Sequence, residues 1–139
     1  MHPRWLVKRW LGPHGKENVE KLLAFNNASA PVCLRVNTLV ASREKFLADL
    51  EEIKVKAHAS SWSKDGIVID EMPSLMTIFE KFPDSFYIQD ESSMLVADFL
   101  NPQKGECILD LCAAPGGKTT HLAQRMENQG EIIACDVHE

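Results

Sequence analysis

The stretch ILDLCAAPGGKTTHLA, from Ile108 to Ala123, places a cysteine, two adjacent glycines and a lysine between an apolar run and a helix-like run. These residue types fit a cysteine nucleophile, a phosphate-binding loop or a cofactor loop. Glycines let the backbone approach a ligand closely, and the first N–H groups of the following helix point toward it unpaired. Asp136 follows 19 residues after Gly117, close to the spacing of ~20 at which a carboxylate accepts hydrogen bonds from ribose hydroxyls. Loop and acid together predict an adenosine-type ligand.

Two of the possible loop types fit this sequence poorly. The Walker phosphate loop, G-x-x-x-x-G-K-[ST], needs its first glycine where this chain has Cys112, and bulk there blocks the phosphate cradle. The dinucleotide fingerprint G-x-G-x-x-G is absent, because only Gly116 and Gly117 occur. A loop for S-adenosylmethionine holds no phosphate and needs less glycine, so it fits best. The plainer alternative is a tight glycine turn, a solvated Lys118 and a strand-end cap at Asp136.

The elements that position this loop form a strand–loop–helix–strand pattern. Residues 107–112 and 131–136 are mostly apolar and predict two strands, and KTTHLAQRM between them predicts a helix with His121 on its surface. Strands joined through a helix run parallel in a βαβ unit. The loop is therefore expected at the end of the first strand.

The N-terminal part of the chain predicts two short helices, HPRWLVKRWLGPHG and KENVEKLLAFN, with Gly12-Pro13 ending the first. Arg4, Lys8, Arg9 and Lys16 give residues 1–16 a charge of +4, so the remainder carries −9. Such a basic segment on an acidic body reads either as a solvated helix face or as a contact to nucleic-acid phosphates. The net charge of −5 argues against a chain that binds nucleic acid over its whole surface.

Residues 28–88 alternate between strand-like and helical segments. Strands are expected in VCLRVNTL, IKVKAH, GIVID and SFYIQ. The first of these has Leu34 and Val36 on one face, with Cys33 and Arg35 on the other. The segment SLMTIFEKF is ambiguous between a short helix and irregular structure.

Two helices in this pattern have residues that favour N-caps. Ser42 is expected to begin a helix through Leu50, and Asp90 one through Leu100. The second helix is expected to turn three apolar residues to the core: Met94, Leu95 and Phe99.

Composition places the chain among globular proteins, with 139 residues of which 45% are hydrophobic and 25% charged. No apolar run approaches the ~20 residues of a membrane helix and no signal-like core is present, which favours a cytoplasmic protein without a membrane partner. No His/Cys cluster has metal-ligand spacing. The cysteines form no C-x-x-C pair and are expected to be reduced and mostly buried: Cys33, Cys107, Cys112 and Cys135.

Several segments resemble one enzyme family. DLCAAPGGKTTHLA resembles the first cofactor motif of the RNA cytosine-C5 methyltransferases, and ACDVHE resembles their second. Within that family, the bacterial 16S ribosomal-RNA methyltransferases of the RsmB/Sun type are most similar. HPRWLVKRW, LRVNTL and YIQDESS resemble that group's linker, its RNA-binding subdomain and the helix that leads into the catalytic domain. The resemblance covers essentially the whole chain, and CAAPGGK is its most specific part.

The resemblance implies an α/β fold in three parts. Residues 1–27 are a helical linker or hairpin, 28–88 a small α/β RNA-binding subdomain, and 89–139 the first βαβ unit of a Rossmann-like methyltransferase domain. Asp110 is implied to lie near the methionine part of the cofactor. The cofactor is implied to be S-adenosylmethionine, held by loop and second-strand residues: Cys112, Ala113, Ala114, Pro115, Gly116, Gly117, Lys118 and Asp136.

The resemblance implies RNA as the partner, with 16S ribosomal RNA expected and transfer RNA as the alternative substrate. Arg35 and the helix residues Arg4, Lys8 and Arg9 are candidate phosphate contacts. In the alternative, that helix only packs against the subdomain through its tryptophans. A non-catalytic RNA-binding adaptor with a decayed cofactor loop is the alternative from a different class.

The family reaction needs a cysteine thiolate that attacks C6 of cytosine, and in the family this nucleophile lies in later motifs. No catalytic residue is therefore assigned to these 139 residues. We expect a fragment cut at both ends, which does not turn over and binds S-adenosylmethionine weakly or not at all. Its strands 107–112 and 131–136 are expected to lack neighbours, leaving this tail mobile or engaged in self-association.

Overall fold

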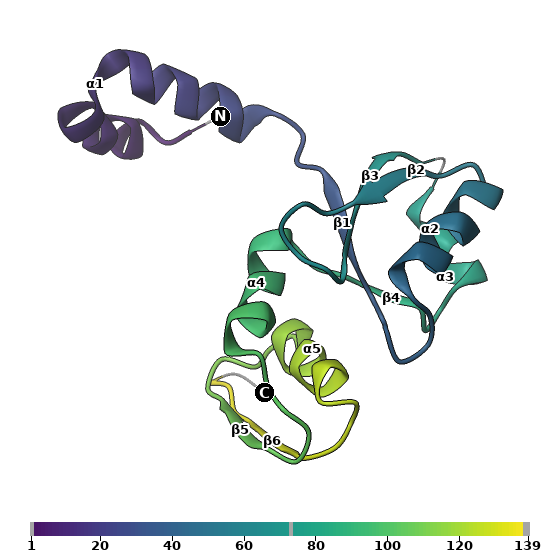
Figure 1. Ribbon diagram of the computed structural model, residues 1–139. Helices are drawn as coiled ribbons and strands as arrows, with labels where there is room; N and C mark the ends of the chain where they lie inside the picture. The colour runs from purple at the N-terminus through teal and green to yellow at the C-terminus, as the bar shows by residue number, and fades with distance from the viewer. Residues whose placement is uncertain (1, 73, 138–139) are drawn as a thin grey trace. The chain divides into compact units, whose positions relative to one another are not determined.

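The computed structural model describes residues 2–72 and 74–137, so the end of the ACDVHE motif lies outside the described residues (Figure 1). The chain divides into two compact units, Met1–Ala30 and Pro31–Glu139. Within the described part, no helix has both the length and the apolar character that crossing a bilayer requires.

The first unit is helix α1, Arg4–Asn27, which is interrupted at Gly15. The sequence predicted an interruption at Gly12-Pro13, but both residues lie inside the helix and the chain turns after them. Gly15 has a φ of 71°, a backbone conformation that glycine adopts at low cost and that ends helices efficiently. The aromatic rings of His2 and Trp10 meet edge to face, with centroids 6.2 Å apart.

The second unit begins with a four-stranded antiparallel sheet and two helices. Its elements follow the order β1 (Val32–Val36), α2 (Arg43–Glu52), β2 (Lys56–Ala59), β3 (Gly66–Glu71), α3 (Leu75–Lys81) and β4 (Phe86–Ile88). The strands lie in the order β2-β3-β1-β4, and all neighbours pair antiparallel. This βαββαβ arrangement is the ferredoxin-like fold. The ambiguous segment SLMTIFEKF contains α3.

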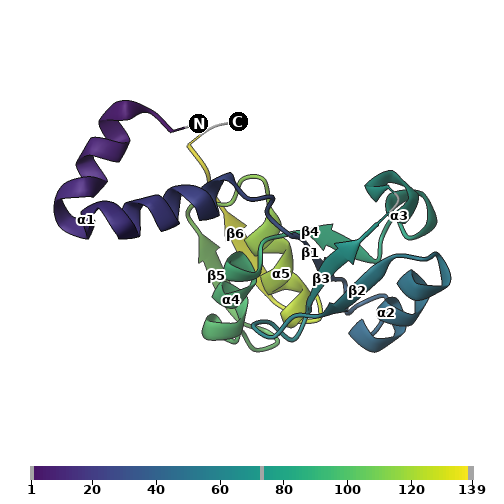
Figure 2. The same ribbon diagram turned by 90° about the horizontal axis from the view of Figure 1, so that it is seen from above.

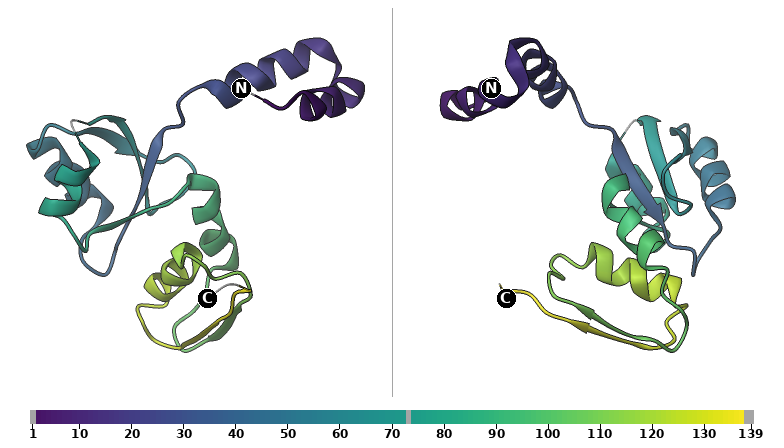
Figure 3. Two further views of the ribbon diagram at one scale, coloured as in Figure 1. Left: turned by 180° about the vertical axis from the view of Figure 1, so that it is seen from behind. Right: turned by 60° about the vertical axis from the view of Figure 1, so that its left-hand side comes forward.

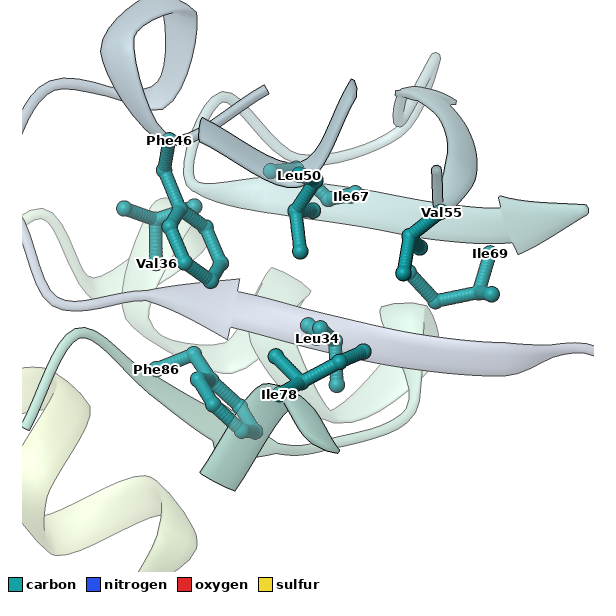
Figure 4. Packing of buried hydrophobic residues seen from close by; sticks show 9 residues of the cluster. All are labelled: Leu34, Val36, Phe46, Leu50, Val55, Ile67, Ile69, Ile78 and Phe86. Atoms are coloured by element: carbon teal, nitrogen blue, oxygen red, sulfur yellow. The ribbon is translucent and has the colours of Figure 1, made fainter. Parts of the chain in front are cut away.

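Helices α2 and α3 cover one face of this sheet and close the main core (Figures 1 and 2). Leu34 and Val36 point from β1 into this core, as the alternation predicted, and meet Phe46 and Leu50 of α2 (Figure 4). Ser42 begins α2 as predicted, because its side chain accepts a hydrogen bond from the N–H of Lys45 at 3.1 Å. Burying each large side chain stabilises the fold by roughly 1.5–3 kcal/mol.

The remaining elements are α4 (Glu91–Leu100), β5 (Cys107–Asp110), α5 (Gly117–Arg125) and β6 (Glu131–Ala134). Strands β5 and β6 pair in parallel, which confirms the predicted βαβ unit. Helix α5 lies between this two-stranded sheet and the four-stranded sheet (Figures 1 and 3). The second face of the four-stranded sheet, which carries Cys33 and Arg35, is therefore also covered.

The predicted burial of Phe99 and of most cysteines is wrong. Phe99 is 85% exposed, because α4 turns Met94 and Ala97 inward and leaves Phe99 on its outer side. Only Cys33 is a buried cysteine, and all four are free thiols. Cys107, Cys112 and Cys135 are exposed, because β5 and β6 carry little cover and the residues that follow them form loops.

Candidate cofactor-binding loop

The loop Cys112–Lys118 connects β5 to α5 and is tied to the ends of both parallel strands. The backbone N–H of Ala113 donates to the carbonyl of Cys135 at 3.0 Å, and that of Cys135 donates to the carbonyl of Asp110 at 2.7 Å. These bonds extend the ladder beyond its regular strands. The loop therefore lies at the carboxyl ends of β5 and β6, where open α/β sheets bind their ligands.

Two carboxylates accept hydrogen bonds from the loop and its neighbours. Asp110 accepts hydrogen bonds from the N–H of Cys112 at 3.2 Å and from the hydroxyl of Thr119 at 2.6 Å. Asp136 accepts from the N–H groups of Ala114 and Val137, both at 2.8 Å. Asp136 thus braces the loop against the end of the second strand.

The two glycines serve different structural needs. Gly116 has a φ of 99° and turns the chain into α5, and a Cβ there would meet no heavy atom within 4 Å. Gly117 lies against the four-stranded sheet, where a Cβ would stand 3.2 Å from Cε1 of Tyr87. Gly116 thus permits the turn into α5, and Gly117 permits the loop to pack closely on the ring of Tyr87.

The first turn of α5 has no side-chain cap within the described part of the chain. Gly116 caps the helix but has no side chain with which to accept from the N–H groups that follow. Beside this turn lies a pocket of about 220 Å³, which the loop shares with the segment from Tyr87 to Ser93. Lys118 and Asp90 also line it. The site thus combines backbone donors, a cation and carboxylates, a set that suits a polar nucleoside ligand.

Arg35 reaches this loop from β1. Its Nη1 donates to Oε1 of Gln89 at 2.6 Å and to the carbonyl of Gly117, and its Nη2 donates to the hydroxyl of Thr120 at 2.9 Å. The residue is only 4% exposed. Burial lowers the pKa of Arg35 to about 10, although the nearby Tyr87 and Asp65 favour its charged form. The buried guanidinium is engaged with the loop, which does not favour the predicted contact with an RNA phosphate.

Tyr87 lies directly opposite Arg35 on β4. Its ring lies under the guanidinium, 5.2 Å from ring centroid to Cζ, and its hydroxyl donates to the carbonyl of Pro115 at 3.4 Å. Tyr87, Gln89 and Thr120 were not among the predicted site residues. The segment YIQDESS contains Tyr87 and Gln89. A sequence signal did exist, because Arg35 lies on the strand face opposite the apolar residues, and a partner for its charge could have been sought on that face.

A second polar cluster joins α5 to the ferredoxin-like part. Oδ2 of Asp65 lies 2.9 Å from Nε2 of His121 and 3.3 Å from Nη1 of Arg125, whose Nη2 lies 3.0 Å from Oδ1 of Asp98. Burial lowers the pKa of Arg125. His121 was predicted on the helix surface, and this is wrong, since the residue is fully buried. The prediction failed because α5 is covered on the side that faces the four-stranded sheet.

The basic residues Arg4, Lys8 and Arg9 are exposed on α1. Among the described residues, none of the three forms an ion pair, whereas Lys16 pairs with Glu20 at 3.7 Å. Their side chains are therefore accessible to an anionic partner. Among the residues whose positions are described, no cluster of histidine, cysteine and acidic side chains could hold a metal ion.

The fold and the loop define a two-part α/β protein, in which a ferredoxin-like sheet is joined to a Rossmann-like βαβ unit. Residues 2–75 match the family described as RsmF/B-like methyltransferase, ferredoxin-like domain, and residues 97–139 match 16S rRNA methyltransferase RsmB/F. The chain belongs to this RsmB/RsmF methyltransferase family.

Individual relatives agree with this assignment. The chain is 36% identical over 138 residues to the probable ribosomal RNA small subunit methyltransferase B of Bacillus subtilis, covering 99% of this chain and 31% of the relative. It is 39% identical over 136 residues to ribosomal RNA small subunit methyltransferase B of Pseudomonas putida, covering 98% and 31%. The chain thus spans about a third of the length of these relatives.

A solved structure extends the comparison to three dimensions. A methyltransferase homologue from Pyrococcus horikoshii superposes with a TM-score of 0.83 at 33% sequence identity, covering 99% of this chain and 45% of that one. The fold described above is therefore shared by a methyltransferase homologue over nearly the whole chain.

Proposed function

We propose that this chain is part of an S-adenosylmethionine-dependent RNA cytosine-C5 methyltransferase that modifies 16S ribosomal RNA. The observation that carries the proposal is the loop Cys112–Lys118, held between Asp110 and Asp136 at the carboxyl ends of two parallel strands. The names of the matching families and relatives support the substrate class. Action on ribosomal RNA would also place the protein in the cytoplasm.

The residues of the loop fit the cofactor. S-adenosylmethionine would supply an activated methyl group. Asp136 would accept hydrogen bonds from its ribose hydroxyls, and the first N–H groups of α5 would face its polar groups. Asp110, which already accepts a hydrogen bond from Thr119, would border the methionine part. Cys112, Ala113, Ala114, Pro115, Gly116, Gly117 and Lys118 would form the wall of the site.

The chemistry on cytosine requires a thiolate that adds to C6, so that C5 becomes nucleophilic, and a base that then removes the C5 proton. We assign neither role to this chain. Cys112 belongs to the wall of the cofactor site, Cys33 is buried, and Cys107 and Cys135 lie on the β5–β6 unit. A part of the protein outside these 139 residues would supply the nucleophile, consistent with the 31% of the Bacillus subtilis relative that the chain covers.

The direct test is methyl transfer by the full-length protein. Purified protein, S-adenosylmethionine with a labelled methyl group and unmodified 16S ribosomal RNA are incubated, and the digested RNA is analysed by mass spectrometry. We expect label in 5-methylcytosine of the 16S RNA. Label in transfer RNA alone would support the alternative substrate, and RNA binding without transfer to either RNA would support a non-catalytic adaptor.

We further propose that Arg4, Lys8 and Arg9 contact RNA phosphates, because their side chains are exposed and unpaired among the described residues. Replacing all three by alanine in the full-length protein is expected to weaken RNA binding and to reduce the salt dependence, by about 0.7–0.9 in slope for each lost contact. The matched control replaces Lys21, Lys45 and Lys56, each of which pairs with an acidic side chain. An unchanged slope in the first variant would support a packing role.

A further inference from the structure

The ferredoxin-like sheet contacts the candidate cofactor loop through side chains of two paired strands. Arg35 on β1 and Tyr87 on β4 are register partners, and both lie on the sheet face opposite the main core. Arg35 binds the carbonyl of Gly117 and the hydroxyl of Thr120, while Tyr87 binds the carbonyl of Pro115. The loop and the first turn of α5 are thus held at three points from a neighbouring subdomain.

The shape of the guanidinium suits this contact. Its planar fork reaches Gln89, Gly117 and Thr120 at once, which the single ammonium group of a lysine cannot reproduce. The stacked ring of Tyr87 covers one side of the fork. The hydroxyl of Thr120 in turn contacts the carbonyl of Gly116 at 2.8 Å, so the fork and the glycine turn belong to one hydrogen-bond network.

The position of the Arg35 charge indicates a role other than stabilising helix α5. A cation beside the first turn of α5 lies at the end where the helix dipole is already positive, so it does not stabilise the helix. It raises the positive potential at the loop and favours an anionic group there. The carboxylate in the methionine part of S-adenosylmethionine is such a group.

We propose that Arg35 is a positioning residue for the cofactor loop, through which the ferredoxin-like subdomain sets the affinity for S-adenosylmethionine. This inference rests on the proposed function. Arg35 acts through the carbonyl of Gly117 and the hydroxyl of Thr120, and its buried fork is not available to RNA. The ferredoxin-like subdomain is then a structural part of the cofactor site as well as a candidate RNA-binding element.

Kinetics of the full-length protein test this inference. In R35K the fork is lost while the charge is kept, and we expect the dissociation constant and KM for S-adenosylmethionine to rise about tenfold, as for the loss of a hydrogen bond to a charged group. The rate constant kcat, the affinity for RNA and its salt dependence should change little. R43K is the matched control, since the Arg43 guanidinium donates to a backbone carbonyl, that of Ser63 at 3.4 Å, and does not contact the loop.

A second variant keeps the test decisive if R35K does not fold. T120V removes the hydroxyl that accepts from Arg35 but leaves the arginine in place, and we expect the same rise for S-adenosylmethionine. In the double variant the two effects should be less than additive, which independent structural damage would not produce.

The outcomes separate the two proposals. If the wild type, R35K and T120V all bind S-adenosylmethionine equally well, the role of Arg35 is overturned and the proposed function stands. Reduced RNA affinity in R35K with unchanged cofactor affinity would also overturn the role of Arg35 in favour of a phosphate contact, because lysine keeps the charge but loses the bidentate fork. Wild-type protein that binds no S-adenosylmethionine would overturn the proposed function and this inference together.

Discussion

Oδ2 of Asp65 joins side chains from two parts of the protein. It lies within hydrogen-bonding distance of His121 and Arg125 on α5, although Asp65 itself precedes β3 of the ferredoxin-like sheet. The carboxylate is 5% exposed and the imidazole of His121 is fully buried. Without the Asp65 carboxylate, the buried His121 loses its side-chain partner at Nε2, whereas Arg125 keeps its contact with Asp98.

Asp65→Ala is accordingly expected to destabilise the 139-residue chain by about 1–3 kcal/mol, the cost of leaving a buried polar group unsatisfied, measured by urea denaturation. The comparison is Asp49→Ala, which breaks the exposed ion pair with Lys45 and should cost less than about 1 kcal/mol. Equal losses for the two variants would mean that the buried cluster contributes no more than a surface pair.

Cys33 differs from the other three thiols in accessibility, since it alone is buried. Burial, followed by the charge of Glu91, raises the pKa of the Cys33 thiol, so its thiolate fraction near neutral pH is smaller than that of an ordinary cysteine. Timed alkylation followed by mass spectrometry should therefore modify Cys107, Cys112 and Cys135 first. Raising the pH should speed modification of Cys33 until its thiol has ionised. Early labelling of Cys33 in folded protein would contradict this order.

The sequence located the site residues on the correct elements but did not reveal their partners. The alternation of β1 correctly placed Arg35 on the face away from the core, yet it carried no information on what covers that face. The contacts of Arg35 with Gly117 and Thr120 link residues more than 80 positions apart. His121 was misplaced for the same reason, because helical periodicity cannot show that a polar side is covered by a distant loop.

At the scale of elements, local signals were informative where they rest on backbone chemistry. Ser42 and Asp90 cap α2 and α4 as predicted, and both accept from the backbone of the first turn. The end of the first part of α1 was misplaced, since Pro13 lies within the helix and Gly15 is the residue that changes the backbone conformation. The alternation of apolar and polar residues identified strands β1 and β3, which lie inside the sheet. The sequence of α3 was too short for its helical pattern to be distinguished from irregular structure.

Ser42→Ala removes the side-chain acceptor for the N–H of Lys45 and is expected to destabilise the chain by about 1 kcal/mol. Thermal unfolding followed by circular dichroism measures the effect. Ser61→Ala serves as the control, because Ser61 is exposed and caps no helix. A loss in the control equal to that in S42A would show that the cap bond is not the cause.

At the scale of the whole molecule, the two sheets differ in how well they are covered. The four-stranded sheet has helices α2 and α3 on one face and α5 near the other, whereas β5 and β6 leave apolar side chains exposed, among them Leu109 and Ile133. Parallel sheets are normally covered on both faces. This exposure was expected from the apolar composition of the two strands together with the family resemblance, which implies further strands beside them.

The 139-residue chain made by itself is therefore expected to self-associate through β5 and β6. Sedimentation velocity should show a mass that increases with concentration, and the combined substitutions Leu109→Lys and Ile133→Lys should reduce the association. Met76→Lys is the control, because Met76 is also exposed but belongs to α3. A chain that remains monomeric at all concentrations while β6 stays ordered would contradict the expectation.

The most direct test of the central claim is calorimetric titration of the full-length protein with S-adenosylmethionine, in the wild type and in D136N. Asparagine retains an oxygen that can accept from Ala114 but loses the charge and one acceptor position. We predict saturable binding by the wild type, about tenfold weaker binding by D136N, and no change in the control D84N. No binding by the wild type, or equal affinity in D136N, would contradict the assignment of this loop as the cofactor site.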